Sequence, residues 1–206
     1  SGTPKERYRN NIAAIRLLFS LEKENRLANK DEQEILAKYV GWGGLSDVFD
    51  STKSNWANEY TELKSLLSDG EYAQARESTL TAFYTPPIVI DSIYSILDNL
   101  GFKYGNILEP ACGTGNFLGR LPHQMKDCKL YGIELDSITG RIAKQLYQKA
   151  NITVDGYENT NLPDSFFDVA ISNVPFGQFR VSDKRYNKLN FNIHDYYFAK
   201  TLDKVR

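Results

Sequence analysis

Apolar positions in the first 80 residues recur at the three- and four-residue spacing of amphipathic helices. Within residues 8–28, Ile12, Ile15 and Leu18 fall on one stripe, which predicts a helix with one buried face. Asn29 followed by Glu32 has the pattern of a capping box that opens a second helix. This second helix is predicted over residues 29–40, and two more helices are predicted over residues 55–68 and 71–78. Residues 1–80 therefore read as an N-terminal helical annex.

The pattern changes after residue 80, where short apolar runs alternate with helical segments. Strands are expected over residues 106–109, 129–134, 151–154 and 166–172. Helices are expected over residues 88–100, 116–124, 137–150 and 193–205. This alternation is typical of an α/β domain with a doubly wound parallel sheet. We expect residues 81–206 to form such a domain with about four strands. We expect this sheet to be incomplete and the domain to be truncated at the C-terminus.

Polar residues end each of the expected strands. Glu109, Glu134, Asp155 and Asn173 all follow or close an apolar run. In open α/β sheets, ligands bind outside the carboxyl ends of the strands. The four residues are therefore predicted to share one site.

A glycine turn follows the first of these strands. Gly113 and Gly115 lie two residues apart, just after Glu109. Glycines let the backbone pass close to a ligand where a Cβ atom would collide. An acid beside such a turn argues against a phosphate and favours a ligand with a positive or hydrogen-donating group. S-adenosylmethionine, which carries an ammonium beside a sulfonium, has these properties.

Composition narrows the class of protein. The chain has 206 residues, of which 41% are hydrophobic and 25% charged, as in an ordinary water-exposed globular domain. It contains no run of 18 apolar residues, so no membrane contact and a cytoplasmic location are expected. Cys112 and Cys128 lack metal-ligand spacing and, with two histidines in the chain, no metal site is expected.

Charge is unevenly distributed although the net charge is −1. Residues 1–30 and 179–206 each carry seven Lys and Arg against three acids, whereas residues 31–178 carry 11 basic and 20 acidic residues. Basic ends around an acidic centre are compatible with phosphate contacts beside a pocket for a cationic cofactor. Solvated helix faces would give the same distribution, so charge alone does not decide between them.

Four segments together resemble a known family. They are Phe83-Tyr84-Thr85-Pro86, Glu109-Pro-Ala-Cys-Gly-Thr-Gly-Asn-Phe117, Gly132-Ile-Glu-Leu-Asp136 and Asn173-Val-Pro-Phe176. In this order they are similar to gamma-type S-adenosylmethionine-dependent adenine-N6 DNA methyltransferases. The segments Asn25-Arg-Leu-Ala and Tyr39-Val-Gly-Trp-Gly-Gly-Leu45 further resemble the N-terminal methylase region of large methylase–helicase proteins of conjugative elements and phages.

The resemblance implies an enzyme, a Rossmann-like fold and methyl transfer from S-adenosylmethionine to the exocyclic amine of adenine in DNA. Glu109 and the amides of Gly113 and Gly115 would hold the methionine end, and Glu134 would accept the ribose hydroxyls. Leu135 would form an apolar wall for the adenine ring of the cofactor. The full set of cofactor-binding residues expected from the resemblance is Tyr84, Thr85, Pro86, Glu109, Ala111, Gly113, Gly115, Asn116, Glu134, Leu135 and Asp155.

The acceptor for the cofactor's adenine amine remains open between two acids. Asp155 fits the end of the third strand better, whereas Glu158 lies at a distance from Asn173 that is similar to the family's spacing. Asp155 is the preferred assignment.

The segment Asn173-Val174-Pro175-Phe176 carries the catalytic hypothesis. The side-chain oxygen of Asn173 and the carbonyl of Val174 would accept hydrogen bonds from the target amine and aim its lone pair at the methyl group. Pro175 would stiffen the turn. Phe176 would stack on an adenine flipped out of the DNA, because the amine cannot reach the cofactor inside a duplex.

Val174 stands where the family usually has proline, so reduced activity is a real alternative. Two other functions stay open: a methyltransferase acting on protein glutamine or RNA, and a catalytically silent module that binds S-adenosylmethionine or DNA. The sequence shows no target-recognition segment, so further domains of the same polypeptide, helicase-like or sequence-recognising, are expected partners. His194 and Asp195 are interpreted as capping or packing residues of the last helix.

Overall fold

A computed structural model of the chain describes residues 2–80 and 85–206. The described residues form two compact units. The first unit contains residues 2–80 and 136–148, and the second contains residues 85–135 and 149–206. Helices make up the first unit, and the second contains a parallel sheet.

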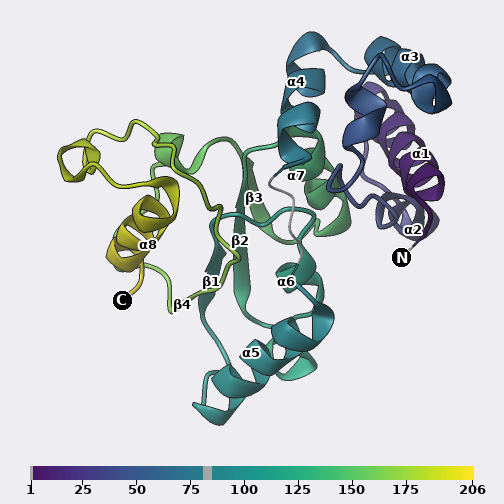
Figure 1. Ribbon diagram of the computed structural model, residues 1–206. Coiled ribbons are helices and arrows are strands. Elements are labelled where there is room, and N and C mark those ends of the chain that lie inside the picture. Colours follow the sequence, from purple (N-terminus) through teal and green to yellow (C-terminus); the bar gives the residue numbers. More distant parts are fainter. Residues whose placement is uncertain (1, 81–84) are drawn as a thin grey trace. The chain divides into compact units, whose positions relative to one another are not determined.

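The helical unit is built from five α-helices and two 3-10 turns among its described residues. They are α1 (Pro4–Lys23), α2 (Lys30–Leu36), η1 (Ser46–Phe49), η2 (Ser54–Trp56), α3 (Ala57–Leu66), α4 (Asp69–Ser78) and α7 (Ser137–Leu146), as labelled in Figure 1. The predicted capping box of α2 is confirmed, because Asn29 accepts from the Glu32 amide and Glu32 accepts from the Asn29 amide.

Helix α1 ends five residues earlier than the sequence pattern predicted. The pattern continues to Ala28, but the helix stops at Lys23 because Asn25 adopts a left-handed conformation, with φ of 52°. The Arg26 amide then donates to the Leu21 carbonyl, which closes the end of the helix. A short polar side chain such as that of asparagine tolerates this conformation better than most residues do.

The loop Gly41–Gly44 is fixed inside the helical unit by two side chains of α1. Asn11 is fully buried, donates to the Gly41 carbonyl at 2.7 Å and accepts from the Val40 amide at 2.9 Å. Trp42, at the centre of the loop, is 1% exposed and packs against the rings of Tyr8 and Phe49. The loop is therefore part of the core of this unit.

Helix α7 follows strand β2 in the chain, yet its packing partners are the helices of the first unit. Ile138 and Ile142 are buried in the same apolar cluster as α1. Gln145 accepts a hydrogen bond from the Ala28 amide at 2.8 Å, and Arg141 forms ion pairs with Glu22 and Glu71. The sequence pattern placed this helix with residues 81–206, whereas its contacts group it with the annex helices.

The second unit contains a four-stranded sheet in the order β3-β2-β1-β4, with all three pairings parallel. The strands are β1 (Asn106–Glu109), β2 (Lys129–Glu134), β3 (Asn151–Val154) and β4 (Val169–Ala170). The first three match their predicted bounds. The chain crosses the sheet from β1 outward through β2 to β3 and then returns to β4 on the other side of β1, which is a doubly wound topology.

Strand β4 is much shorter than the predicted run 166–172. The amides of Phe166 and Phe167 donate to the carbonyl of Lys204 at the end of the last helix, and the Arg206 amide donates to the Phe167 carbonyl. The first residues of the predicted strand therefore pair with the C-terminal end of the chain. Beyond β4, the Ile171 amide still donates to the Leu108 carbonyl of β1 at 2.9 Å.

Helices cover both faces of the sheet. Figure 1 shows α8 (Ile193–Lys204) on one side and α5 (Pro87–Asn99) and α6 (Asn116–Gly119) on the other. Leu108 packs into the apolar cluster that contains α8, and its neighbour Ile107 packs into the cluster of α5 and α6, as the alternation of a strand requires. Short 3-10 turns complete the unit: η3 (His123–Met125), η4 (Tyr157–Asn159) and η5 (Asn187–Leu189).

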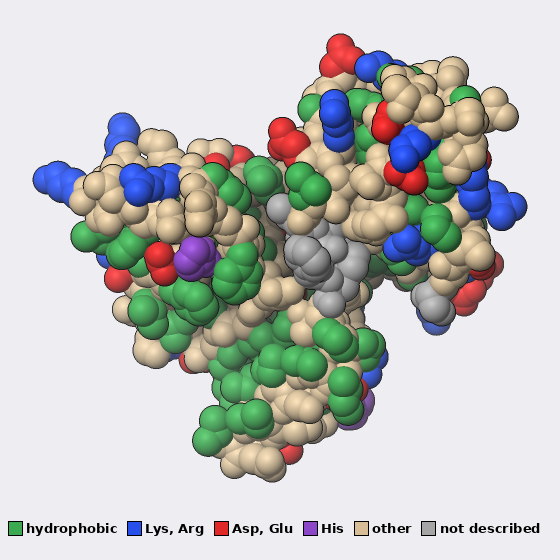
Figure 2. Space-filling model, in the orientation of Figure 1, with side chains coloured by type: hydrophobic (Ala, Val, Ile, Leu, Met, Phe, Trp, Pro, Cys, Tyr) green, Lys and Arg blue, Asp and Glu red, His purple; other side chains and the backbone are tan. Residues whose placement is uncertain are grey.

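Helix α5 carries apolar side chains on its outer face as well as its inner face. Ile90 and Tyr94 are buried, whereas Ile88, Ile96 and Leu100 are mostly exposed. Figure 2 shows hydrophobic side chains gathered over the α5 region in the lower part of the view.

Candidate functional site

The parallel sheet brings the polar strand ends to one edge. Glu109 of β1 is in register with Gly132 of β2, and Glu134 of β2 with Val154 of β3. On the other side of β1, Leu108 is in register with Ala170 of β4. Because parallel strands end at the same edge, the segments that carry the four predicted polar residues are neighbours there.

The glycine turn after β1 adopts the backbone conformation that its sequence predicts. Gly113 and Gly115 have φ of 55° and 84°, in the left-handed region that favours glycine. The turn is anchored by the Cys112 amide, which donates to the Ile133 carbonyl of β2 at 2.8 Å. Apart from its chain neighbours, no heavy atom of residues 2–80 and 85–206 lies within 4 Å of the position that a Cβ atom of Gly113 would take, so this part of the structure leaves space beside the turn.

Glu109 is a buried acid at the end of β1. Its side chain is 3% exposed, and Oε2 has no hydrogen-bond partner among the described residues. Burial raises the pKa of this carboxyl well above its usual range, and the nearby Glu134 raises it further. An unpaired buried acid destabilises a fold unless a ligand completes it. Glu109 is therefore suited to receive a cationic donor.

Glu134 ends β2 and already has a hydrogen bond to the glycine turn. Its Oε2 accepts from the Gly113 amide at 2.7 Å. The same amide is the one that the sequence assigned to the methionine carboxylate. The next residue, Leu135, is 61% exposed, so an apolar side chain stands beside this carboxylate at the strand end.

The two alternative acids after β3, Asp155 and Glu158, make different local contacts. Asp155 Oδ1 accepts from the Gly156 amide at 2.7 Å and from Asn159 Nδ2 at 2.8 Å, which holds the η4 turn. Glu158 folds back over Gly156, where a Cβ atom would lie 2.3 Å from its Oε1. One oxygen of Asp155 is thus used within its own turn, and the choice between the two acids stays a prediction.

The segment after β4 starts beside the end of β1, because β4 pairs with β1 and the Ile171 amide donates to the Leu108 carbonyl. Val174 packs against the apolar cluster that contains α8. Phe176 is 68% exposed, and its ring stacks on that of His194, with centroids 5.6 Å apart and planes inclined by 24°. Sequence reasoning assigned His194 to capping or packing. Its contact with Phe176 joins positions 18 residues apart, and no spacing rule in the sequence signals it.

The structure describes all but one of the remaining predicted cofactor-binding residues. Tyr84 lies outside the described residues. Pro86 precedes the first residue of α5 and is exposed, and Thr85 is half-buried. Ala111 packs beside the α8 cluster, and Asn116 is the exposed first residue of α6. Their contacts with a cofactor stay predictions.

Comparison with known sequences identifies the family. The sequence profile of the N-6 DNA Methylase family matches residues 65–202, which is more than half of the chain. The chain belongs to this family. Its cofactor is accordingly S-adenosylmethionine, as the resemblance implied. Within the described part of the chain, Oε2 of Glu109 has no partner and space remains beside Gly113, and both features fit the charged methionine end of this molecule.

Individual relatives agree with this assignment but are much longer. The chain is 26% identical over 201 residues to Defense against restriction protein B of Escherichia phage P1, covering 95% of the chain and 7% of that protein. It is 25% identical over 170 residues to the methylase subunit of the type I restriction enzyme MjaIX of Methanocaldococcus jannaschii, covering 74% of the chain and 28% of the subunit. The chain therefore spans a small part of these relatives.

A solved structure supports the fold. A class I S-adenosylmethionine-dependent methyltransferase from Listeria monocytogenes superposes with a TM-score of 0.51 at 16% identity, covering 98% of this chain and 71% of that one. With the four-stranded parallel sheet, this likeness confirms the predicted Rossmann-like α/β architecture.

The described residues show neither a metal-binding cluster nor a helix that could span a membrane. Residues 2–80 and 85–206 contain no group of three or more His, Cys, Asp or Glu side chains arranged to hold a metal ion. No helix in this part of the chain combines the length and the apolar character needed to cross a membrane.

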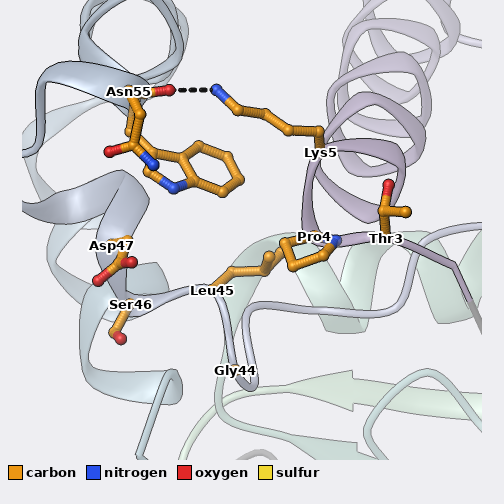
Figure 3. A pocket seen from close by; sticks show the side chains of 9 residues that line it. Thr3, Pro4, Lys5, Gly44, Leu45, Ser46, Asp47 and Asn55 are labelled. Atoms are coloured by element: carbon orange, nitrogen blue, oxygen red, sulfur yellow. Dashed lines mark hydrogen bonds between the residues drawn. The ribbon is translucent and has the colours of Figure 1, made fainter.

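The helical unit has a separate cavity of about 420 Å³ between the start of α1 and the η1–η2 segment. Figure 3 shows Lys5 and Asn55 on opposite sides of it, joined by a hydrogen bond. Lys5 also pairs with Glu59 at 2.6 Å and lies over the Trp56 ring, 4.1 Å from its centroid. The charge of Lys5 is thus already engaged by the protein.

Proposed function

We propose that this chain contains the cofactor-binding and catalytic residues of an adenine-N6 DNA methyltransferase. The observation that carries the proposal is the buried Glu109 at the end of β1, whose Oε2 has no partner among the described residues and which lies one strand away from the strand that leads into Asn173–Phe176. A site for a cationic methyl donor and a site for a planar amine would then share one edge of the sheet.

The residues of the first three strand ends would hold the cofactor, which supplies an electrophilic methyl group when bound. Glu109 would accept hydrogen bonds from the ammonium, and that contact would compensate for the burial of its charge. Glu134 would accept hydrogen bonds from the ribose hydroxyls, and it would exchange its hydrogen bond with the Gly113 amide for them. Leu135, exposed beside it, would cover one face of the adenine ring.

Asn173 and Val174 would position the amine that receives the methyl group. An exocyclic amine conjugated to a ring is a poor nucleophile, because its lone pair is delocalised into the ring. Two acceptors, the Asn173 side-chain oxygen and the Val174 carbonyl, would bind its two N–H groups and favour a tetrahedral nitrogen. The resulting catalysis is positioning with electrostatic stabilisation, and it requires no general base with an unusual pKa.

The Val174 position motivates a second candidate function, a module that binds S-adenosylmethionine without turning it over. Valine keeps the carbonyl that the reaction needs but lacks the fixed φ of proline. Its side chain packs in the α8 cluster, which supports a defined conformation and so favours the active enzyme. We further propose that recognition of a DNA sequence involves additional domains, since the relatives are several times longer than this chain.

The test uses the full-length protein, tritium-labelled S-adenosylmethionine and three acceptor pools: DNA free of N6-methyladenine, tRNA and protein. We expect label in DNA, recovered as N6-methyladenine after digestion. Asn173→Ala should abolish transfer while the Kd for S-adenosylmethionine changes less than about tenfold, or ~1.4 kcal/mol. Asn99→Ala, at an exposed position on α5, is the matched control and should keep full activity.

The alternatives predict other results. Label confined to tRNA or protein would replace the DNA assignment with an RNA or glutamine methyltransferase. Cofactor binding by the wild type with no label in any pool would favour the silent module. Undiminished turnover by Asn173→Ala would remove the catalytic assignment of that residue.

A further inference from the structure

The segment that follows the catalytic motif folds back onto the start of α8. The Ile193 amide donates to the Phe179 carbonyl at 2.9 Å. Gly177 lies against the Phe179 ring so closely that a Cβ atom would be 2.6 Å from two of its carbons. Phe176 and the first turn of α8 are therefore held together by backbone as well as side-chain contacts.

This fold places the imidazole of His194 against one face of the Phe176 ring. The two planes are inclined by 24° with centroids 5.6 Å apart, an offset stack. Phe176 nevertheless remains 68% exposed. One face of its ring is thus supported by the protein, and much of the rest is available to another flat group.

The ring of His194 has few polar contacts that could fix its orientation. Its Nδ1 is buried and has no hydrogen-bond partner among the described residues, and its Nε2 lies 3.6 Å from Asp195 Oδ2, beyond a good hydrogen bond. The backbone beneath it is well anchored, because Ile193 is 3% exposed and Tyr196 is likewise buried. The stack with Phe176 is accordingly the main defined contact of this imidazole.

We propose that His194 is a positioning residue for the target base: it supports Phe176 from behind so that an adenine can stack on the opposite face. This inference rests on the proposed function, because it needs a flat base at Phe176. The role requires a planar ring at position 194 and no proton transfer. Without the supporting ring, Phe176 would have more freedom to rotate, and fewer bound adenines would be aligned for reaction.

The experiment measures methyl transfer to DNA free of N6-methyladenine by the full-length protein and its variants. His194→Ala should lower kcat/KM for DNA about fivefold, the size of an aromatic-pair contribution, and leave the KM for S-adenosylmethionine unchanged. His194→Phe restores a flat ring and should return activity to within about twofold of the wild type. Asp195→Asn removes the adjacent charge but keeps the stack, and serves as the matched control with unchanged activity.

A double-mutant cycle separates positioning through Phe176 from a general structural effect. In a Phe176→Leu background, His194→Ala should cause no further loss, because the ring that it supports is already absent. Thermal melting of each variant checks that the fold is retained. Additive losses in the cycle, or failure of His194→Phe to restore activity, would overturn the role of His194.

Failure of the proposed function gives a different result. A wild-type protein that transfers no methyl group to DNA would overturn both proposals. A wild-type protein that methylates DNA, together with a His194→Ala variant of equal kcat/KM, would overturn only the inference about His194.

Discussion

Two buried ionisable side chains of the sheet-containing unit, Lys200 and Glu109, differ in how well the protein satisfies them. Lys200 on α8 is 3% exposed, and its Nζ donates to the Tyr157 carbonyl at 2.6 Å, to the Thr160 carbonyl at 3.3 Å and to Asp183 at 3.0 Å. Glu109 on β1 is equally buried, yet its Oε2 has no partner in the described part of the chain.

The difference supports a structural role for Lys200 and the ligand-binding role that we propose for Glu109. Burial lowers the pKa of Lys200, but the contacts with Asp183 act in the opposite direction and favour its charged form. For Glu109, burial and the neighbouring acid both raise the pKa. A buried ion with all its partners stabilises the contacts between the segments that supply them. A buried acid without a partner lowers the stability of the folded protein until a cation binds to it.

The largest expected effect on stability comes from replacing Lys200, the buried group that has all its partners. Lys200→Met should lower the free energy of unfolding by about 3 kcal/mol, because it leaves Asp183 half-buried beside Tyr196 without its cation. Chemical denaturation of the full-length protein measures this change. Lys188→Met, at an exposed position on η5, is the control and should change stability by less than about 0.5 kcal/mol. Equal effects of the two substitutions would contradict the structural role of Lys200.

Removing the charge of the unpartnered group should affect ligand binding more than folding. Glu109→Gln should weaken binding of S-adenosylmethionine about 30-fold, or ~2 kcal/mol, because the amide cannot form a charge-assisted hydrogen bond with the ammonium. Isothermal titration calorimetry measures the Kd, and Lys200→Met, if folded, should bind with nearly wild-type affinity. An unchanged Kd for Glu109→Gln would show that the ammonium lies elsewhere.

The same variant gives a pH test in the absence of cofactor. Because the folded-state pKa of Glu109 is raised, its contribution to stability is fully present below the ordinary Glu pKa and is lost as the pH rises through the folded pKa. Glu109→Gln should therefore match the wild type at low pH and become the more stable protein as pH increases, by up to ~1.4 kcal/mol per pH unit within that window. Parallel stability curves for the two proteins would argue against a buried, neutral Glu109.

The smallest expected effect distinguishes the two acids after β3. Asp155→Asn should weaken cofactor binding about threefold, or ~0.6 kcal/mol, since one of its oxygens already belongs to the η4 turn. Glu158→Gln, the matched substitution, should leave the Kd unchanged if Asp155 contacts the adenine amine. The reverse ranking in the same calorimetric titration would transfer that role to Glu158.

The sequence predicted the parts of this site that depend on local patterns. Short apolar runs ending in acids gave the correct bounds of β1, β2 and β3, and hence the edge at which Glu109 and Glu134 meet. Spacing also predicted the glycine turn, because a left-handed backbone is a local property of Gly113 and Gly115. These features arise from neighbours in the chain.

Features that depend on residues far apart in the chain could not be predicted from local sequence patterns. Strand β4 is short because Phe166 and Phe167 bond to the end of α8, about 40 residues away. The stack of His194 on Phe176 and the contacts of Lys200 with Asp183 are likewise tertiary. A histidine at a helix start and a lysine within a helix are each common, and neither position carries a signal of its partner.

The position of α7 in the chain affects how the protein folds during synthesis and where it can be cut into expression fragments. Ile138 and Ile142 pack in the same apolar cluster as α1. Gln145 accepts a hydrogen bond from the Ala28 amide, which lies 117 residues earlier in the chain. During synthesis, the annex consequently cannot finish folding until β2 and the ten residues of α7 have left the ribosome. An expression fragment that ends at residue 80 would therefore lack α7, the last helix of the helical unit. A fragment without the annex would leave the apolar face of α7 exposed.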